Sequence, residues 1–146
     1  MHPNKKYFKQ LSSIPIDQFF LDVLYNKKYG YYSTKYPFEK QGDYITASTV
    51  SPLFAEIIGI WIVYMWEKFK KPKNFNVVEL GPGNGKFMNT LIKTFENFPE
   101  FNEAVKIFLY EKSLSLKDKQ RKNLLGRKVK WISNFDKIRK GPVIFF

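Results

Sequence analysis

The 146-residue sequence contains no cysteine. Disulfides, cysteine-ligated zinc and thiol nucleophiles are therefore excluded, and this composition suits a reducing compartment. Histidine occurs once, at His2 close to the start of the chain. We therefore expect neither a catalytic imidazole nor a metal site.

Long apolar segments are also lacking. The first ten residues, M-H-P-N-K-K-Y-F-K-Q, carry charge, and no apolar core follows them, so they are not a secretory signal. The most apolar run, residues 53–66, is 14 residues long and includes Glu56. A bilayer span needs roughly 20 apolar residues. We expect this run to form a buried helix of a soluble protein.

Arginine is scarce, with 3 residues against 22 lysines, and the net charge is +12. A basic chain can bind nucleic acid or an anionic membrane surface. Proteins that recognise bases and phosphates, however, favour the bidentate guanidinium of arginine. The lysines are spread along the chain, so we interpret them as solvated surface rather than as a nucleic-acid site. Nucleic-acid binding stays as a third hypothesis, which predicts an affinity that falls steeply with salt.

Helices and strands alternate in the second half of the chain, which fits its 44% apolar and 18% aromatic composition. Apolar residues at helical spacing predict helices over residues 12–25 and about 51–69, and K-K-P-K-N at 70–74 ends the second. We then expect strands at 75–80, 105–110, 129–132 and 142–146, with helices at 86–95 and 116–125. Strands separated by such helices predict an α/β fold with a parallel sheet.

The stretch V-V-E-L-G-P-G-N-G-K-F at 77–87 places Gly81, Gly83 and Gly85 directly after an apolar strand. Glycines there let the chain turn sharply and let a ligand lie against bare backbone, next to the positive end of the following helix. Dinucleotide enzymes use G-x-G-x-x-G, and a phosphate P-loop needs Ser or Thr after its lysine. Phe87 stands at that position here, so a P-loop is excluded.

With the acidic Glu79 ahead of its glycines, the loop resembles the cofactor loop of class I S-adenosylmethionine (SAM) methyltransferases. The second expected element is an acid at the end of the next strand, and Glu111 follows residues 107–110. A carboxylate there can accept hydrogen bonds from both ribose hydroxyls. Taken singly, these features could be a plain turn, a salt-bridged carboxylate and an ordinary strand-end acid. Their order, each at a strand terminus, favours SAM.

Motifs along almost the whole chain resemble the MidA-type methyltransferases, the bacterial and mitochondrial relatives of the complex I assembly factor that methylates an arginine of a respiratory complex I subunit. The motifs are L-Y-x-x-x-Y-G-Y-Y (24–32), G-D-Y-I-T (42–46), Trp61 and Trp66 in an apolar helix, V-E-L-G-P-G-N-G (78–85), Y-E-K-S (110–113), Gln120, V-K-W (129–131) and G-P (141–142).

The resemblance implies a Rossmann-like class I methyltransferase sheet, with its first four parallel strands in the order 3-2-1-4 after a helical N-terminal region. Residues 1–72 would form that region, with its aromatic and turn segment, and residues 73–146 the first part of the SAM-binding domain. It implies a protein substrate and either the bacterial cytoplasm or the mitochondrial matrix. It places Gly81, Gly83, Gly85 and Glu111 around SAM, with Thr46 near the pocket.

The sequence departs from the family pattern in three places. Ala47, Ser48 and Thr49 stand where family members commonly have P-E or P-H, and Asn84 stands where arginine is usual. Family members run to well over twice this length, and their N-E-F-F-D-A segment would follow the fourth strand. We therefore expect a chain truncated after Phe146 and assign no catalytic residue.

Two hypotheses remain beside nucleic-acid binding. The chain is a SAM-dependent methyltransferase, or the first half of one, or it is a non-catalytic remnant that pairs its open sheet edge with a partner chain. The coding sequence beyond Phe146 would separate the two, because an N-E-F-F-D-like continuation would indicate a split or disrupted enzyme. An NAD-binding version of the sheet would need a differently spaced glycine loop.

Overall fold

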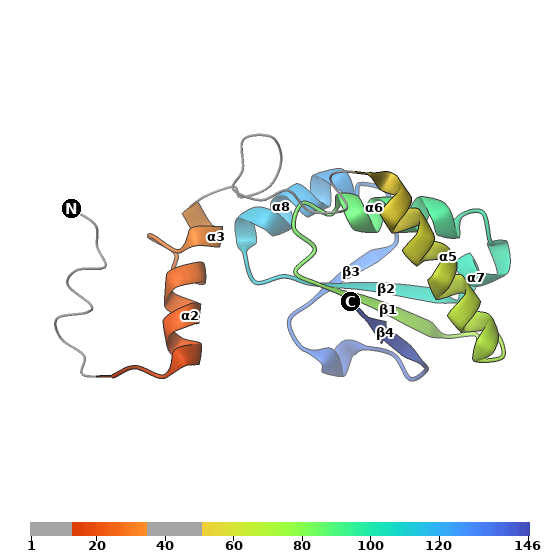
Figure 1. Ribbon diagram of the computed structural model, residues 1–146, viewed down its shortest axis with the longest axis horizontal. Coiled ribbons are helices and arrows are strands. Elements are labelled where there is room, and N and C mark those ends of the chain that lie inside the picture. The colour runs from red at the N-terminus through yellow and green to blue at the C-terminus, as the bar shows by residue number, and fades with distance from the viewer. Residues whose placement is uncertain (1–12, 35–50) are drawn as a thin grey trace. The chain divides into compact units, whose positions relative to one another are not determined.

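The computed structural model describes residues 13–34 and 51–146, which fall into two compact units (Figure 1). The division at residue 72 that we expect from the sequence stays a prediction, and so does the placement of Thr46 and the G-D-Y-I-T segment, which lie outside the described residues.

The first unit contains helices α2 (Ile16–Tyr25) and α3 (Tyr31–Thr34). Asp22 closes the turn between them, because its carboxylate accepts hydrogen bonds from Asn26 Nδ2 at 2.7 Å and from the Tyr29 hydroxyl at 2.6 Å. Gly30 is buried, and a Cβ there would meet the Asn26 backbone nitrogen at 2.4 Å. Glycine at this position therefore allows the second helix to start where it does.

The second unit is built on a four-stranded parallel sheet in the order β3-β2-β1-β4. Its strands are β1 (Phe75–Leu80), β2 (Val105–Tyr110), β3 (Val129–Ile132) and β4 (Val143–Phe145). β1 and β2 are paired along their whole lengths, from Phe75 opposite Val105 to Leu80 opposite Tyr110. The expected strand order is confirmed.

Helices cover one face of this sheet, as Figure 1 shows for α5 (Pro52–Lys68), α6 (Lys86–Phe95) and α8 (Leu114–Asn123). Between α6 and β2 lies the short helix α7 (Pro99–Ala104), which the sequence did not lead us to expect. Phe101 of α7 is fully buried, and its ring lies edge-on to Phe95, Trp66 and Phe75 at centroid distances of 4.9, 5.4 and 5.9 Å. These aromatic contacts join three helices to β1.

The opposite face of the sheet has a smaller core of Val78, Phe108 and Ile132. The segment between β3 and β4 runs beneath this face and includes the 3-10 turn η1 (Phe135–Lys137) (Figure 1). Ile138 of this segment packs against the small core.

Helix α5 differs from the buried helix that we expected. Its buried residues are Ala55, Gly59, Ile62, Val63 and Trp66. Six of its other apolar side chains are about half exposed in the described structure, and they are Leu53, Phe54, Ile57, Ile60, Trp61 and Tyr64. The reason is geometric: a helix lying on one layer can bury one side against it. Gly59 marks the closest approach, since a Cβ there would meet Thr94 Cγ2 at 2.9 Å.

The end of α5 has an unusual backbone. Lys70 and Lys71 have φ angles of 63° and 52°, in the left-handed region that non-glycine residues rarely adopt. The Lys71 amide donates to the Trp66 carbonyl at 3.0 Å, which caps the helix before Pro72. Within residues 13–34 and 51–146, no helix has both the length and the apolar content to cross a bilayer.

Candidate cofactor site

The glycine loop lies at the carboxyl end of β1, where parallel α/β sheets place their ligands. Gly81, Gly83 and Gly85 have φ angles of 68°, 53° and 79°. The Gly81 amide donates to the Tyr110 carbonyl at 2.9 Å, so the loop starts beside the end of β2. A Cβ added at Gly81 would meet no atom within 4 Å, so open space lies beside the backbone there.

Gly85 is the N-cap of α6 and lies against α8. A Cβ there would meet Leu124 Cδ1 at 3.2 Å and the Gln120 Cα at 3.5 Å. The left-handed backbone and this close approach both favour glycine. The third glycine of the loop therefore sets how closely the two helices meet.

Glu79 precedes the loop and is buried, with 7% of its surface exposed. Its Oε2 atom has no hydrogen-bond partner among the described residues. Burial, together with the nearby charge of Glu111, raises the pKa of Glu79 to about 8. A buried carboxyl with a free acceptor atom fits a ligand that brings a positive charge, and SAM carries both an ammonium and a sulfonium group.

Glu111 follows β2 and is equally buried. Its Oε1 atom accepts hydrogen bonds from the backbone amides of Lys112 and Ser113, both at 2.8 Å. Its Oε2 atom accepts one from Gln120 Nε2 at 3.2 Å. Since each carboxylate oxygen can accept two hydrogen bonds, Oε2 keeps capacity for one more donor. The local backbone and α8 together fix the carboxylate, which is what a hydroxyl-binding group requires.

The sequence did not predict the role of Gln120 in this site. It identified Gln120 only as one of the residues that resemble the family. It is fully buried. Its Nε2 also donates to the Gly83 carbonyl at 2.9 Å, and its Oε1 accepts from Trp131 Nε1 at 2.8 Å. Because an indole nitrogen can donate and cannot accept, this contact fixes which way the amide points.

A pattern in the sequence could have revealed this role. Leu116, Gln120 and Leu124 are spaced four apart along α8 and its end, and all three are buried. A glutamine in such an apolar stripe must find hydrogen-bond partners. Its partners lie on the glycine loop, on Glu111 and on β3.

Asn123 adds a second connection from α8 to the loop. Its Nδ2 donates to the Asn84 carbonyl at 2.8 Å, three residues beyond the Gln120 contact on the same helix. The Asn84 side chain is used locally, since its Oδ1 accepts from the Lys86 amide at 3.0 Å at the start of α6. Helix α8 thus holds two successive loop carbonyls.

The structure thus brings together Glu79, Gly81, Gly83, Gly85 and Glu111 at the ends of adjacent strands. In the described part of the chain, no three histidine or acidic side chains gather in a way that could hold a metal ion.

Comparison with known proteins identifies the family. A family model described as "Putative S-adenosyl-L-methionine-dependent methyltransferase" matches residues 57–146. The chain belongs to this family, the MidA-type methyltransferases. The match includes the glycine loop and Glu111, the two elements from which the sequence predicted SAM.

Several curated relatives have similar sequences. One is the mitochondrial protein arginine methyltransferase NDUFAF7 of Xenopus laevis, 32% identical over 123 residues, which are 83% of this chain and 28% of the relative. The corresponding human protein is 31% identical over the same coverage. The Drosophila melanogaster homolog is 38% identical over 87 residues, 60% of this chain and 20% of the relative. The chain therefore spans less than a third of the length of these relatives.

Solved structures confirm the fold. A crystal structure from Burkholderia thailandensis, bound to S-adenosyl-homocysteine, matches with a TM-score of 0.72 and 24% sequence identity. The match covers 90% of this chain and 36% of the other. A second structure of a protein from the same organism matches with a TM-score of 0.66. The four-stranded sheet and its helices therefore correspond to one part of a class I methyltransferase fold.

Proposed function

We propose that this chain forms the SAM-binding part of a SAM-dependent methyltransferase. The observation that carries the proposal is the placement of Glu79 near the end of β1 and of Glu111 directly after the neighbouring β2, beside a glycine loop with open space at Gly81. Glu79 is buried, and its Oε2 atom has no partner in the part of the chain that the structure describes, so it fits a positively charged ligand.

Each of these residues has a distinct task in the proposed site. Bound SAM would supply an electrophilic methyl group on its sulfonium. Glu111 would accept a ribose hydroxyl at Oε2. Glu79 would be protonated below pH 8 in the free protein and would lose its proton when a cation lies beside it. Gly81 would let the ligand approach the backbone. We assign no catalytic residue among these groups.

The relatives suggest the substrate class. They are named protein arginine methyltransferases and are mitochondrial. We infer that the whole protein methylates an arginine of a protein substrate, for which a subunit of respiratory complex I is the leading candidate. Its location would be the mitochondrial matrix in a eukaryote or the cytoplasm in a bacterium. Thr46 stays our candidate for a further contact to the cofactor.

A second candidate function is an interaction module. Within the described residues, β4 pairs with β1 and has no strand on its other side, and Phe145 is 48% exposed there. An unpaired strand edge can bind another chain. Sedimentation over a range of concentrations tests this function: a partner edge predicts association, whereas a chain that stays monomeric and binds SAM contradicts a purely structural role.

Calorimetric titration of the 146-residue chain with SAM tests the main proposal, with NAD as a control ligand. We expect saturable SAM binding that Glu111→Ala weakens at least tenfold, or about 1.4 kcal/mol. Glu67→Ala removes an exposed carboxylate from α5 and should leave the affinity unchanged. A folded chain that binds no SAM, or binds NAD equally well, would contradict the proposal.

A further inference from the structure

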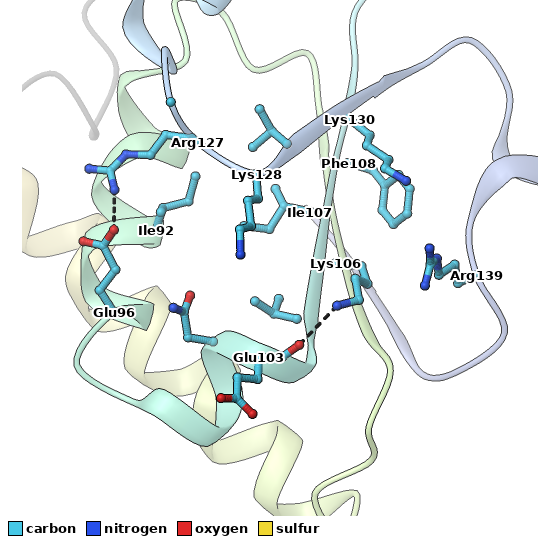
Figure 2. Close-up of a pocket in the computed structure, with 14 residues that line it drawn as sticks. Ile92, Glu96, Glu103, Lys106, Ile107, Phe108, Arg127, Lys128, Lys130 and Arg139 are labelled. Carbon is cyan, nitrogen blue, oxygen red and sulfur yellow. Dashed lines mark hydrogen bonds and ion pairs between the residues drawn. The ribbon is translucent and has the colours of Figure 1, made fainter.

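A second hollow lies at the other end of the sheet, where β2 and β3 begin (Figure 2). It has a volume of about 680 Å³ and is bounded by the end of α6, by α7 and by the segment leading into β3. Glu111 and the glycine loop follow the opposite ends of the strands. This hollow is therefore separate from the proposed cofactor site, and neither site depends on the other.

Cationic side chains dominate the lining of the hollow. Five are basic, against two carboxylates, Glu96 and Glu103, which gives a formal charge of 5 − 2 = +3. The basic residues are Lys106, Arg127, Lys128, Lys130 and Arg139.

Two of the five cations already have partners. Arg127 forms an ion pair with Glu96, and its Nε donates to Asn89 Oδ1 at 3.2 Å. Lys106 Nζ donates to the Glu103 backbone carbonyl at 3.1 Å.

The other three cations are Lys128, Lys130 and Arg139. Among the described residues, no carboxylate lies within ion-pair distance of them. Like charges gathered in a concave site repel one another more than they would on a convex surface. A bound anion would remove that repulsion.

The placement of these charges indicates the shape of the ligand. In Figure 2 the ammonium group of Lys128 points into the space between α6 and β2. Lys130, Lys106 and Arg139 lie on the other side of β2, beside Phe108. Positive charge therefore borders the start of β2 on both sides. A ligand that contacted both groups would carry several negative charges at separate positions.

A simpler interpretation is that these are solvated lysines of a lysine-rich chain. Lys68 and Lys122 fit it, because they lie on exposed helix surfaces and do not line the hollow. The cations of the hollow differ in being gathered around one cavity whose volume is in the usual range for small-molecule sites. Apolar side chains also line it, Ile92 and Ile107 on the helix-covered face of the sheet and Phe108 on the opposite face, which distinguishes it from an open lysine surface.

We propose that the hollow binds a small polyanion with two or more phosphate groups, such as a nucleoside triphosphate. Lysine binds phosphate as a compact point charge, and Arg139, which has no ion pair within residues 13–34 and 51–146, can add a bidentate contact. A single phosphate would use a small part of the volume and of the charge. The chain thus has an anion site in addition to its cofactor site.

Calorimetric titration with inorganic tripolyphosphate and with ATP, at low salt and without a divalent metal, tests this proposal. The paired substitution Lys128→Gln/Lys130→Gln should weaken both ligands at least tenfold, about 1.4 kcal/mol. The matched control Lys68→Gln/Lys122→Gln removes the same charge elsewhere and should change the affinity by about twofold or less. Lys130→Arg keeps the charge and should retain binding.

Three results would overturn the proposal. Equal losses in the two double variants would mean general attraction to a basic chain. Absence of saturable binding by the folded wild-type chain would remove the site altogether. Binding of a single-stranded oligonucleotide without binding of either triphosphate would assign the surface to nucleic acid instead. SAM titration of Lys128→Gln/Lys130→Gln should match wild type, which keeps this test independent of the cofactor site.

Discussion

Gln120 and Glu111 are joined by a hydrogen bond of 3.2 Å between Nε2 and Oε2, inside the protein and at the edge of the proposed cofactor site. The same nitrogen donates to the Gly83 carbonyl at 2.9 Å. One side chain of α8 therefore sets the position of the strand-end carboxylate relative to the glycine loop. A movement of α8 would displace both parts of the site together.

Gln120→Ala should destabilise the chain by about 2–3 kcal/mol, because it leaves the Gly83 carbonyl and the Trp131 Nε1 donor without their partner inside the protein. Urea denaturation followed by circular dichroism measures the loss. Asn123→Ala is the matched control, because it removes one hydrogen bond from an exposed position of the same helix. It should cost about 1 kcal/mol or less. Equal losses would mean that the buried hydrogen bonds of Gln120 contribute no more to stability than the exposed hydrogen bond of Asn123.

Glu79→Gln should reduce the dependence of stability on pH. The folded pKa of Glu79 is about 8 and its ordinary value is 4.5, so between these values the folded chain holds a proton that the unfolded chain has released. The stability of the wild type is therefore greatest below pH 4.5, as far as Glu79 is concerned, and decreases as the pH rises through 8. Over this range the free energy of unfolding falls by about 1.4 kcal/mol for each step of one in pH.

Denaturation of wild type and Glu79→Gln at about pH 6 and about pH 9, on either side of the folded pKa, measures this effect. Between the lower and the higher pH, the free energy of unfolding of the variant should rise relative to that of the wild type by an amount on the order of a few kcal/mol. Glu100→Gln, on the exposed start of α7, serves as the control and should not alter the slope in this direction. A Glu79→Gln profile parallel to wild type would show that Glu79 is ionised normally.

Phe101→Ala should destabilise the chain by about 3–5 kcal/mol, since it empties the space between three aromatic rings in the main core. Thermal and urea unfolding give the value. Phe135→Ala, in the 3-10 turn, removes a ring that is 48% exposed and should cost about 1 kcal/mol or less. A small effect of Phe101→Ala would mean that α7 is not held on the core as described.

Lys70→Gly should stabilise the chain by about 0.5–1 kcal/mol. Lys70 has a φ angle of 63°, where a side chain is strained and glycine is not. The gain is limited because glycine also increases the entropy of the unfolded chain. Urea denaturation measures the difference. Lys73→Gly, in the same connection but without a positive φ, should give no gain. Loss of stability in both variants would show that the positive φ angle of Lys70 does not destabilise the folded chain.

The sequence predicted the bounds of β1, β2 and β3, because each is a short apolar run between turn residues or charges. It predicted the order of the strands through the family resemblance. It did not predict α7, whose six residues, P-E-F-N-E-A, are too few to show a helical period. Nor did it predict which side of α5 is buried, because apolar residues surround that helix and packing alone decides between its faces.

Within the site, the positions of Glu79 and Glu111 could be predicted, because the sequence shows each acidic residue at the end of an apolar run that forms a strand. For Gln120 the sequence could show a buried polar residue but not its partners, since Gly83, Glu111 and Trp131 are brought together only when the sheet is assembled. The placement of Thr46 stays a prediction. Asn84 lies where the family usually has arginine, and its carbonyl, rather than its side chain, contacts α8.

The contacts that shape the glycine loop are distant in sequence. Gln120 is 37 residues from Gly83, and Asn123 is 39 residues from Asn84. We expect such contacts to form late in folding, because closing a long loop costs entropy before any contact offsets it. Substitutions at these positions should therefore speed unfolding more than they slow folding. A molecule bound at the loop would lower the rate of unfolding. The folded chain would therefore persist longer with the ligand bound than without it.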